Sequence, residues 1–188
     1  GWHVPHLAGL VHAPTLRPDC SILDIAGYDG PTRLFFDPHG VAFPDISASP
    51  SRDEAREAAA LLLDLMDECA FVGEADEAVA LSAILTALIR RSLPAAPLHA
   101  FTAPTPGTGK SYIVDIASRI ATGRAAAGAA FSADEAENRK QIDAALVEGA
   151  ATITLDNVTA ELSGARLNQV LTQPEISVRP LGQTKTIT

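Results

Sequence analysis

The sequence predicts an α/β fold with a mainly parallel sheet flanked by helices, preceded by a strand- and loop-rich segment and a pair of helices. Three observations lead to this fold class. Residues 1–50 are rich in proline, glycine and aspartate, with short apolar runs between turns. Residues 51–96 hold two stretches with apolar residues at helical spacing. In residues 97–188 short apolar or β-branched runs alternate with helical stretches, a pattern typical of parallel strands joined by helices.

The first two segments carry clear local patterns. The runs "SILDIAGY" and "RLFF" predict short strands, separated by the turns "YDGP" and "DPHG". Ser51 followed by Glu54 is a capping box that opens a helix. A second helix is expected from Glu74 to Arg91, and the stretch "LPAAP" that ends at Pro97 stops it.

The third segment begins with a short apolar run, "LHAFTA", that predicts a strand ending at a glycine-rich loop. The stretch "GKSYIVDIASRIATG" then predicts a helix that stops at Gly123. A weak strand, "AAAGAAF", follows. Ser132 and Glu135 form another capping box, which opens a helix running to about Gly149.

The remainder predicts a strand, a short helix and a hairpin. The β-branched run "ATITLDN" reads as a strand that ends in Asp156, and "GARLNQVLTQ" as a short helix. The last stretch, "EISVRPLGQTKTIT", predicts a β-hairpin with Gly182 at its turn.

Composition limits the functions that this chain can have. It has 188 residues with a net charge of −9, which argues against a generally basic nucleic-acid coat but not against a local DNA contact. Cys20 and Cys69 have no paired spacing, so neither a disulfide framework nor a cysteine zinc site is expected. No secretory signal or apolar run of ~18 residues is visible, so we expect no membrane association and a cytoplasmic location. Because the chain begins with Gly1, we expect it to be a piece of something longer.

Residues 103–112, "APTPGTGKSY", predict a phosphate-binding loop. Such a loop needs backbone N–H groups that converge on phosphate oxygens, a lysine for the terminal phosphates and a hydroxyl on Mg²⁺. Gly107 and Gly109 let the backbone approach closely, Lys110 supplies the charge and Ser111 the hydroxyl. The expected strand before the loop and helix after it are the context that this motif requires.

The loop departs from the usual pattern, because Pro104 stands where a glycine is common. Proline has no N–H, but the prolines precede most of the expected donors and so cost few phosphate contacts. The alternative is a Gly/Pro turn that carries an exposed lysine. The expected nucleotide-binding residues are Thr105, Pro106, Gly107, Thr108, Gly109, Lys110, Ser111 and Tyr112.

Asp156 is the expected second ligand of the metal. A Mg²⁺ bound to triphosphate needs a carboxylate, usually at the carboxyl end of a strand, and Asp156 ends the run "TITLD". The alternative is an ordinary Asp-Asn turn. Asn157 can orient an attacking water but cannot take its proton. Glu148 or Glu135 could in principle act as the base, but nothing in the sequence places either near the γ-phosphate.

The motifs "APTPGTGKS", "TITLDNV" and "RPLGQTKTI" together resemble the ATPase module of helicase and primase-helicase proteins from phages, plasmids and integrated elements. These proteins are relatives of the superfamily 3 helicases and of the AAA+ class. The stretches "LRPDCSILDIAGYDGPTRLFFDP" and "ALSAILTALIRRSLPAAPLHAFTAPTPGTGKS" extend the resemblance over most of the chain.

The resemblance implies a P-loop NTPase-type fold, ATP and Mg²⁺ as cofactors, a ring of subunits and translocation on single-stranded or forked DNA. By motif position it implies that Lys110 and Ser111 hold phosphate and Mg²⁺ and that Asp156 holds Mg²⁺. We expect Lys110, Asp156 and Asn157 to be the catalytic residues, although many such ATPases have a glutamate in place of Asn157. Arg179 and Lys185, on the expected hairpin, would contact DNA; the alternative is a solvated edge hairpin.

The resemblance also implies parts that this sequence does not supply. A sensor strand and an arginine finger are expected after Thr188, so we expect a truncated core that is weakly active or inactive alone. An alternative to the DNA motor is an ATP-binding switch or scaffold that hydrolyses slowly, for which Asn157 and the acidic net charge argue. A metabolite kinase would need an acceptor site and an arginine-bearing lid, which the sequence does not indicate.

A metal cluster can be drawn from His3, His6, His12 and Cys20. Their spacing matches no zinc pattern, and histidines are common in loops, so we do not expect a metal site there.

Overall fold

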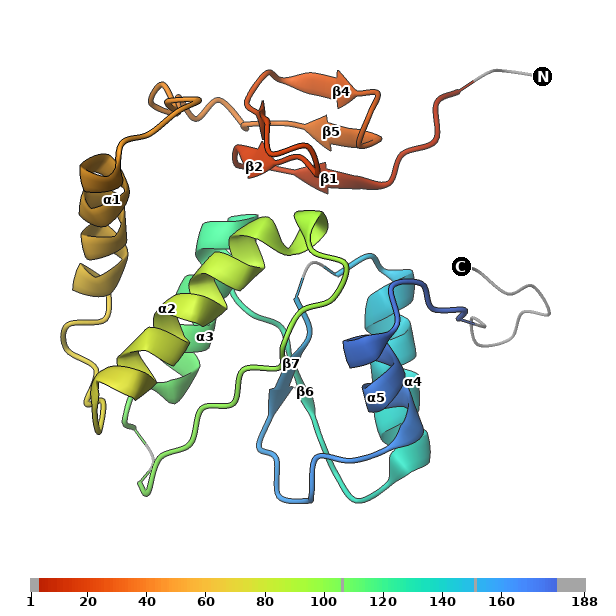
Figure 1. The fold of residues 1–188 in the computed structure, drawn as a ribbon. Coiled ribbons are helices and arrows are strands. Elements are labelled where there is room, and N and C mark those ends of the chain that lie inside the picture. The colour runs from red at the N-terminus through yellow and green to blue at the C-terminus, as the bar shows by residue number, and fades with distance from the viewer. Residues whose placement is uncertain (1–3, 106, 151, 179–188) are drawn as a thin grey trace. The chain divides into compact units, whose positions relative to one another are not determined.

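The computed structural model describes residues 4–105, 107–150 and 152–178. The protein is mixed α/β (Figure 1). Its residues cluster into two compact units. Unit 1 comprises Gly1–Leu93 and His99–Ala125, and unit 2 comprises Pro94–Leu98 and Ala126–Thr188. The division into residues 1–50, 51–96 and 97–188 stays a prediction.

Five short strands form two small sheets in unit 1. They are β1 (Gly9–Val11), β2 (Thr15–Leu16), β3 (Ile22–Leu23), β4 (Gly27–Asp29) and β5 (Leu34–Phe36). β5 lies between β1, to which it is parallel, and β4, to which it is antiparallel, and β2 pairs with β3. Leu23, Leu34 and Phe36 are buried together against Val11. The strands expected in "SILDIAGY" and "RLFF" are therefore confirmed.

Three helices make up the rest of unit 1: α1 (Arg52–Asp64), α2 (Glu74–Ile89), which continues into the 3-10 turn η1 (Arg90–Ser92), and α3 (Lys110–Thr122). The capping box of α1 is confirmed, because the Glu54 N–H donates to Ser51 Oγ at 3.2 Å and the Ser51 N–H donates to Glu54 Oε2 at 2.7 Å. Gly123 ends α3 at a φ of 74°, as expected.

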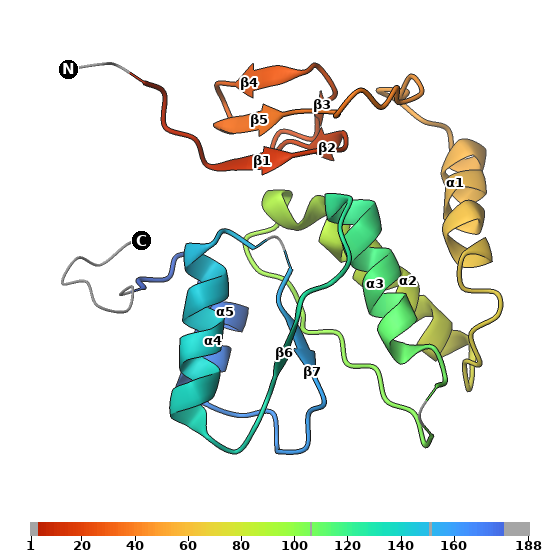
Figure 2. The ribbon, with the colours of Figure 1, turned by 180° about the vertical axis from the view of Figure 1, so that it is seen from behind.

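Helices α2 and α3 pack against each other, as both views show (Figure 2). Their contact forms the main apolar core of unit 1, with the buried residues Met66, Ala80, Ile84, Ile113, Ile116 and Ala117. One face of α3 is buried in this core, whereas Ser111 and Tyr112 in its first turn are exposed to solvent.

The prediction of a strand in "LHAFTA" is wrong. Residues 98–103 are irregular, and no described strand pairs with them. Phe101 instead packs against the α2–α3 core. A run of this composition becomes a strand only where a neighbour completes its ladder of hydrogen bonds, and packing decides otherwise here.

In its described residues, unit 2 contains β6 (Gly128–Ala130), α4 (Glu135–Val147), β7 (Thr154–Asp156) and α5 (Ala165–Thr172). β6 and β7 are parallel and are joined through α4, as the sequence indicated (Figure 1). The buried residues Phe131, Ile142 and Leu167 form the core of this unit.

The expected N-cap of α4 is wrong by two residues. Asp134 caps the helix and accepts hydrogen bonds from the N–H groups of Ala136 and Glu137. Ser132 lies outside the helix, where its hydroxyl accepts from the Asp134 N–H. Both residues have the cap chemistry, but the Ser132 backbone is held by the Asn138 side chain, which accepts from its N–H and donates to its carbonyl, and Asp134 is left to cap the helix.

The turn and the second arm of the hairpin expected near the C-terminus lie outside the described residues, as do Gly182, Arg179 and Lys185. Of its first arm, residues 175–178 are described, and they are irregular apart from a bridge at Val178. Within the described part of the chain, no helix has the length and apolar character needed to cross a lipid bilayer.

Candidate functional site

The glycine-rich loop leads directly into α3 in unit 1. Gly107 has a φ of 80° and Gly109, the N-cap of α3, a φ of 87°. Only glycine takes such angles at low cost. A Cβ on Gly109 would also lie 3.7 Å from Cys69 Sγ. The conformation that turns the chain into α3 therefore depends on both glycines.

The N-terminus of α3 is suited to an anion. The first N–H groups of a helix have no partner within the helix and carry a partial positive charge. No side chain caps this end of α3, and its first turn carries no acidic residue. By contrast, α1 and α4 have capping side chains and acidic residues in their first turns. Of these three helix ends, that of α3 is the one whose charge the protein leaves uncompensated.

The side chains expected to bind phosphate begin this helix. Lys110 is half-buried, Ser111 and Tyr112 are exposed, and Lys110 forms no ion pair with any residue that the structure describes. Thr108 Oγ1 donates to the Thr105 carbonyl at 3.3 Å and so closes the loop on itself. The structure thus brings Thr105, Gly107, Thr108, Gly109, Lys110, Ser111 and Tyr112 together in one turn, and Pro106 lies outside the described residues.

Cys69, beside this loop, was not a predicted site residue. Burial, helped by the negative charge of Glu68, raises the pKa of the Cys69 thiol. A thiol with a raised pKa is a weak nucleophile at neutral pH. Cys69 therefore acts as a small apolar side chain that packs behind Gly109.

Asp156 ends β7 in unit 2, as expected. Its side chain is exposed, and Oδ1 accepts the N–H of Asn157 at 2.8 Å. Gly128 on the neighbouring strand β6 is close, since a Cβ there would lie 3.3 Å from the Asp156 Cβ. Asn157 has a φ of 49°, a left-handed angle that asparagine tolerates better than most residues. The sharp turn at Asn157 leaves the carboxylate at the carboxyl end of the parallel pair.

Lys110 and Ser111 belong to unit 1, whereas Asp156 and Asn157 belong to unit 2. Each half of the expected site has the local geometry described above. The joint binding of one Mg²⁺ by Ser111 and Asp156 stays a prediction.

The two glutamates considered as a base have other surroundings. Glu135 Oε1 accepts the Ala165 N–H at 3.1 Å and so holds the first turn of α5. Glu148 is the C-cap of α4, at the opposite end of that helix from Glu135. The structure gives Glu135 a role in packing α5, and neither residue contacts Asp156 through a hydrogen bond among the described residues.

A polar hollow of about 250 Å³ in unit 2 lies at the end of β6, with Ser132, Glu135, Asn138, Glu161 and Ser163 in its lining. Asn138 exchanges two hydrogen bonds with the Ser132 backbone, and Glu135 is bonded to α5. These groups are used to hold the unit together, so the hollow does not define a binding site.

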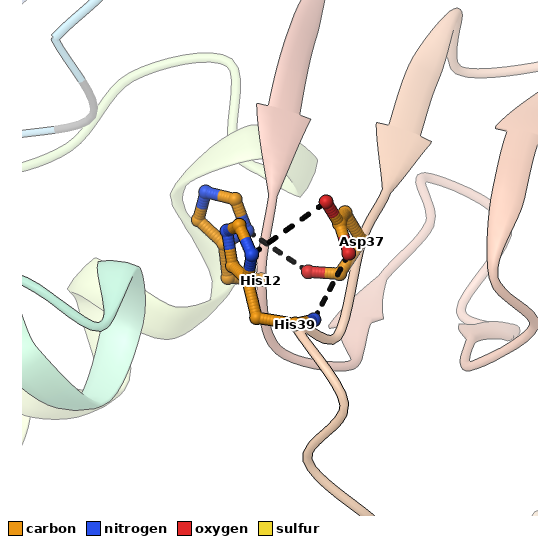
Figure 3. Close-up of side chains that lie close together, drawn as sticks. All are labelled: His12, Asp37 and His39. Carbon is orange, nitrogen blue, oxygen red and sulfur yellow. Dashed lines mark hydrogen bonds and ion pairs between the residues drawn. The ribbon is translucent and has the colours of Figure 1, made fainter.

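A third group of polar side chains was missed in the sequence. His12, Asp37 and His39 each offer a ligand atom within 4.8 Å of the other two, and among the described residues this is the one such group (Figure 3). His12 was considered together with His3, His6 and Cys20, but its structural neighbours are Asp37 and His39. The pairing of strands far apart in the sequence brings them together, and no local pattern indicates it.

Comparison of the chain with protein-family models, with curated proteins and with solved structures finds no match. The function must therefore be inferred from the residues and their geometry.

Proposed function

We propose that this chain is the ATP-binding and ATP-hydrolysing module of a DNA helicase or primase-helicase of a phage or mobile element. The single observation that carries the proposal is the loop before α3. Two glycines at positive φ turn the chain into an uncapped helix N-terminus that begins with Lys110 and Ser111. This arrangement is how proteins hold the phosphates of nucleotides.

Unit 2 supports the proposal independently. It contains a parallel pair, β6 and β7, joined through α4, and the second strand ends in an exposed carboxylate, Asp156. Ligands of parallel α/β sheets bind outside the carboxyl ends of the strands. Ser111 and Asp156 would hold Mg²⁺, which prefers oxygen ligands and bridges the phosphates.

The wider parts of the proposal rest on the resemblance of the sequence motifs. They are the P-loop NTPase-type fold, a homo-oligomeric ring, a DNA contact through Arg179 and Lys185, and a location in the cytoplasm of a bacterial or phage-infected cell. The net charge of −9 argues against a generally basic DNA-binding surface, so a DNA contact is expected to be local, as on such a hairpin.

The test is calorimetric titration of the chain with Mg-ATP, compared with Lys110→Ala. Charge-assisted hydrogen bonds contribute about 1.5–3 kcal/mol each, so the variant should bind at least about 10-fold more weakly. Lys140→Ala is the matched control, because Lys140 is an exposed lysine on α4 whose ion pair is with Glu137. Equal affinity of wild type and Lys110→Ala would contradict the proposal.

A second function is favoured by Asn157, which stands beside the expected metal ligand and cannot accept a proton. It is an ATP-binding switch or scaffold that assembles on DNA or on partner proteins and hydrolyses ATP slowly or not at all. DNA-stimulated ATP turnover in the full-length protein separates the two functions. Turnover that DNA stimulates eliminates the switch, and tight ATP binding without DNA-stimulated turnover eliminates the motor.

A further inference from the structure

The group formed by His12, Asp37 and His39 originates at the ends of two neighbouring strands. β1 and β5 are parallel, with Val11 opposite Phe36. His12 and Asp37 are the next residues along each strand, so they emerge at the same edge of the sheet. The Asp37 N–H also donates to the Val11 carbonyl at 2.9 Å, which extends the pairing by one residue.

His39 is turned back toward this edge. Its N–H donates to Asp37 Oδ1 at 2.9 Å, and its φ of 49° is left-handed. The centres of the His12 and His39 rings are 4.2 Å apart, and His39 Nδ1 lies 3.7 Å from Asp37 Oδ2 (Figure 3). Two imidazoles and one carboxylate therefore meet at one point of the surface.

The hydrogen bonds within this group leave lone pairs that can bind a metal ion. His12 Nδ1 lies 2.9 Å from the Asp37 carbonyl oxygen. A carbonyl oxygen can only accept, so Nδ1 carries the proton, and in the neutral ring the lone pair is on Nε2, which lies on the side of the ring away from Asp37 (Figure 3). Binding of one ion by all three side chains therefore requires the His12 ring to turn as well as the His39 ring. Within the described residues, no lysine or arginine pairs with Asp37 and competes for its charge.

We propose that His12, Asp37 and His39 bind a divalent transition-metal ion of the zinc type, with water completing its coordination. Two imidazoles and a carboxylate favour such an ion over Mg²⁺ or Ca²⁺, which prefer oxygen ligands. Zinc bonds of about 2.0–2.2 Å require ligand atoms nearer than 4.8 Å, so the side chains close around the ion. The His39 side chain, 62% exposed, is free to make that rotation.

The bound ion would act as a clip. It ties the end of β1 to the end of β5 and to the turn that follows β5, three points that are otherwise joined by strand pairing and by the bonds of His12 and His39 to Asp37. The site shares no residue with the glycine loop or with Asp156. It stands or falls independently of the proposed nucleotide function.

The experiment is titration of the whole chain with Zn²⁺, and with Co²⁺ as a spectroscopic probe, in the absence of nucleotide. We expect one ion per chain, a Co²⁺ spectrum without a thiolate charge-transfer band, and a rise in the melting temperature. The test variants are Asp37→Asn, which keeps an acceptor for the His39 N–H, and His39→Asn, which keeps a residue that tolerates positive φ. Each should lower the affinity at least about 10-fold, as changes even to residues that only orient ligands do.

His6→Ala and Cys20→Ser are the controls, because both residues are exposed and stand outside the group. Both should bind Zn²⁺ as the wild type does. Circular dichroism of each variant without metal verifies that it is folded. The proposal is overturned if the wild type binds no ion, if Asp37→Asn and His39→Asn bind as tightly as wild type, or if Cys20→Ser alone abolishes binding.

Discussion

At the scale of single residues, Asp29 connects two of the turns between the N-terminal strands. Arg17 Nη2 donates to Asp29 Oδ1 at 2.9 Å, and Thr32 Oγ1 donates to Asp29 Oδ2 at 2.5 Å. The hydrogen bond from Arg17, reinforced by Thr32, lowers the pKa of the Asp29 carboxyl to about 2. The ionised carboxylate thus joins the turn after β2, through Arg17, to the turn after β4.

This pKa predicts a dependence of stability on pH. Because the folded state lowers the pKa of Asp29, its contribution is fully present above the unfolded value of about 3.9 and is lost as the pH falls through about 2. We expect the free energy of unfolding of the wild type to fall more between about pH 4 and pH 2 than that of Asp29→Asn. Denaturant unfolding at several pH values measures this difference.

Asp45→Asn is the control, since Asp45 lies in an exposed loop. Its unfolding should follow the pH dependence of the wild type. If the curve of Asp29→Asn also matches that of the wild type, the ion pair with Arg17 does not exist in solution.

At the scale of elements, α1 depends on its first turn. No residue of α1 is fully buried, and only its C-terminal end, through Leu62 and Leu63, packs against the α2–α3 core, so the capping box is an important support of its first turn. Ser51→Ala should lower the stability by about 1 kcal/mol, because it removes the acceptor of the Glu54 N–H. Thermal unfolding by circular dichroism measures the loss. Ser49→Ala, in the exposed loop just before, should change nothing; an equal effect of both would refute a specific cap.

The turn into α3 is the element on which the proposed function depends. Gly109→Ala would place a Cβ at a φ of 87° and beside Cys69. We expect it to cost about 1–2 kcal/mol in stability and to weaken Mg-ATP binding, because the left-handed angle is strained for alanine. Gly30→Ala is the control, since nothing lies within 4 Å of a Cβ there. Unchanged binding by Gly109→Ala would show that the loop conformation does not matter.

The same elements show what the sequence could and could not predict. Ser51 with Glu54, Gly123 and the apolar spacing of α2 are local patterns, and they located their helices correctly. The strand prediction for residues 98–103 was wrong because a strand needs a pairing partner, which the local sequence does not specify. His12 and Asp37 meet only because β1 pairs with β5 across the intervening hairpin, a contact that no spacing rule indicates.

At the scale of the whole molecule, the residues of the proposed nucleotide site are divided between the two units. The lysine and hydroxyl lie in unit 1 and the acidic residue in unit 2. The mixed α/β class and the parallel pair β6–β7 agree with the sequence. That Ser111 and Asp156 act on one nucleotide remains a prediction.

The most direct measurement is the amide NMR spectrum of the labelled chain, recorded as Mg-ATP is added and again with Lys110→Ala. It observes every backbone N–H of both units at once. We expect the largest shifts at Gly107, Gly109, Lys110 and Ser111, whose N–H groups would bind phosphate, with further shifts at Asp156 that require Mg²⁺, and none of these in the variant. Unperturbed amides in the loop, or shifts that persist in Lys110→Ala, would contradict the account that this loop is a nucleotide site.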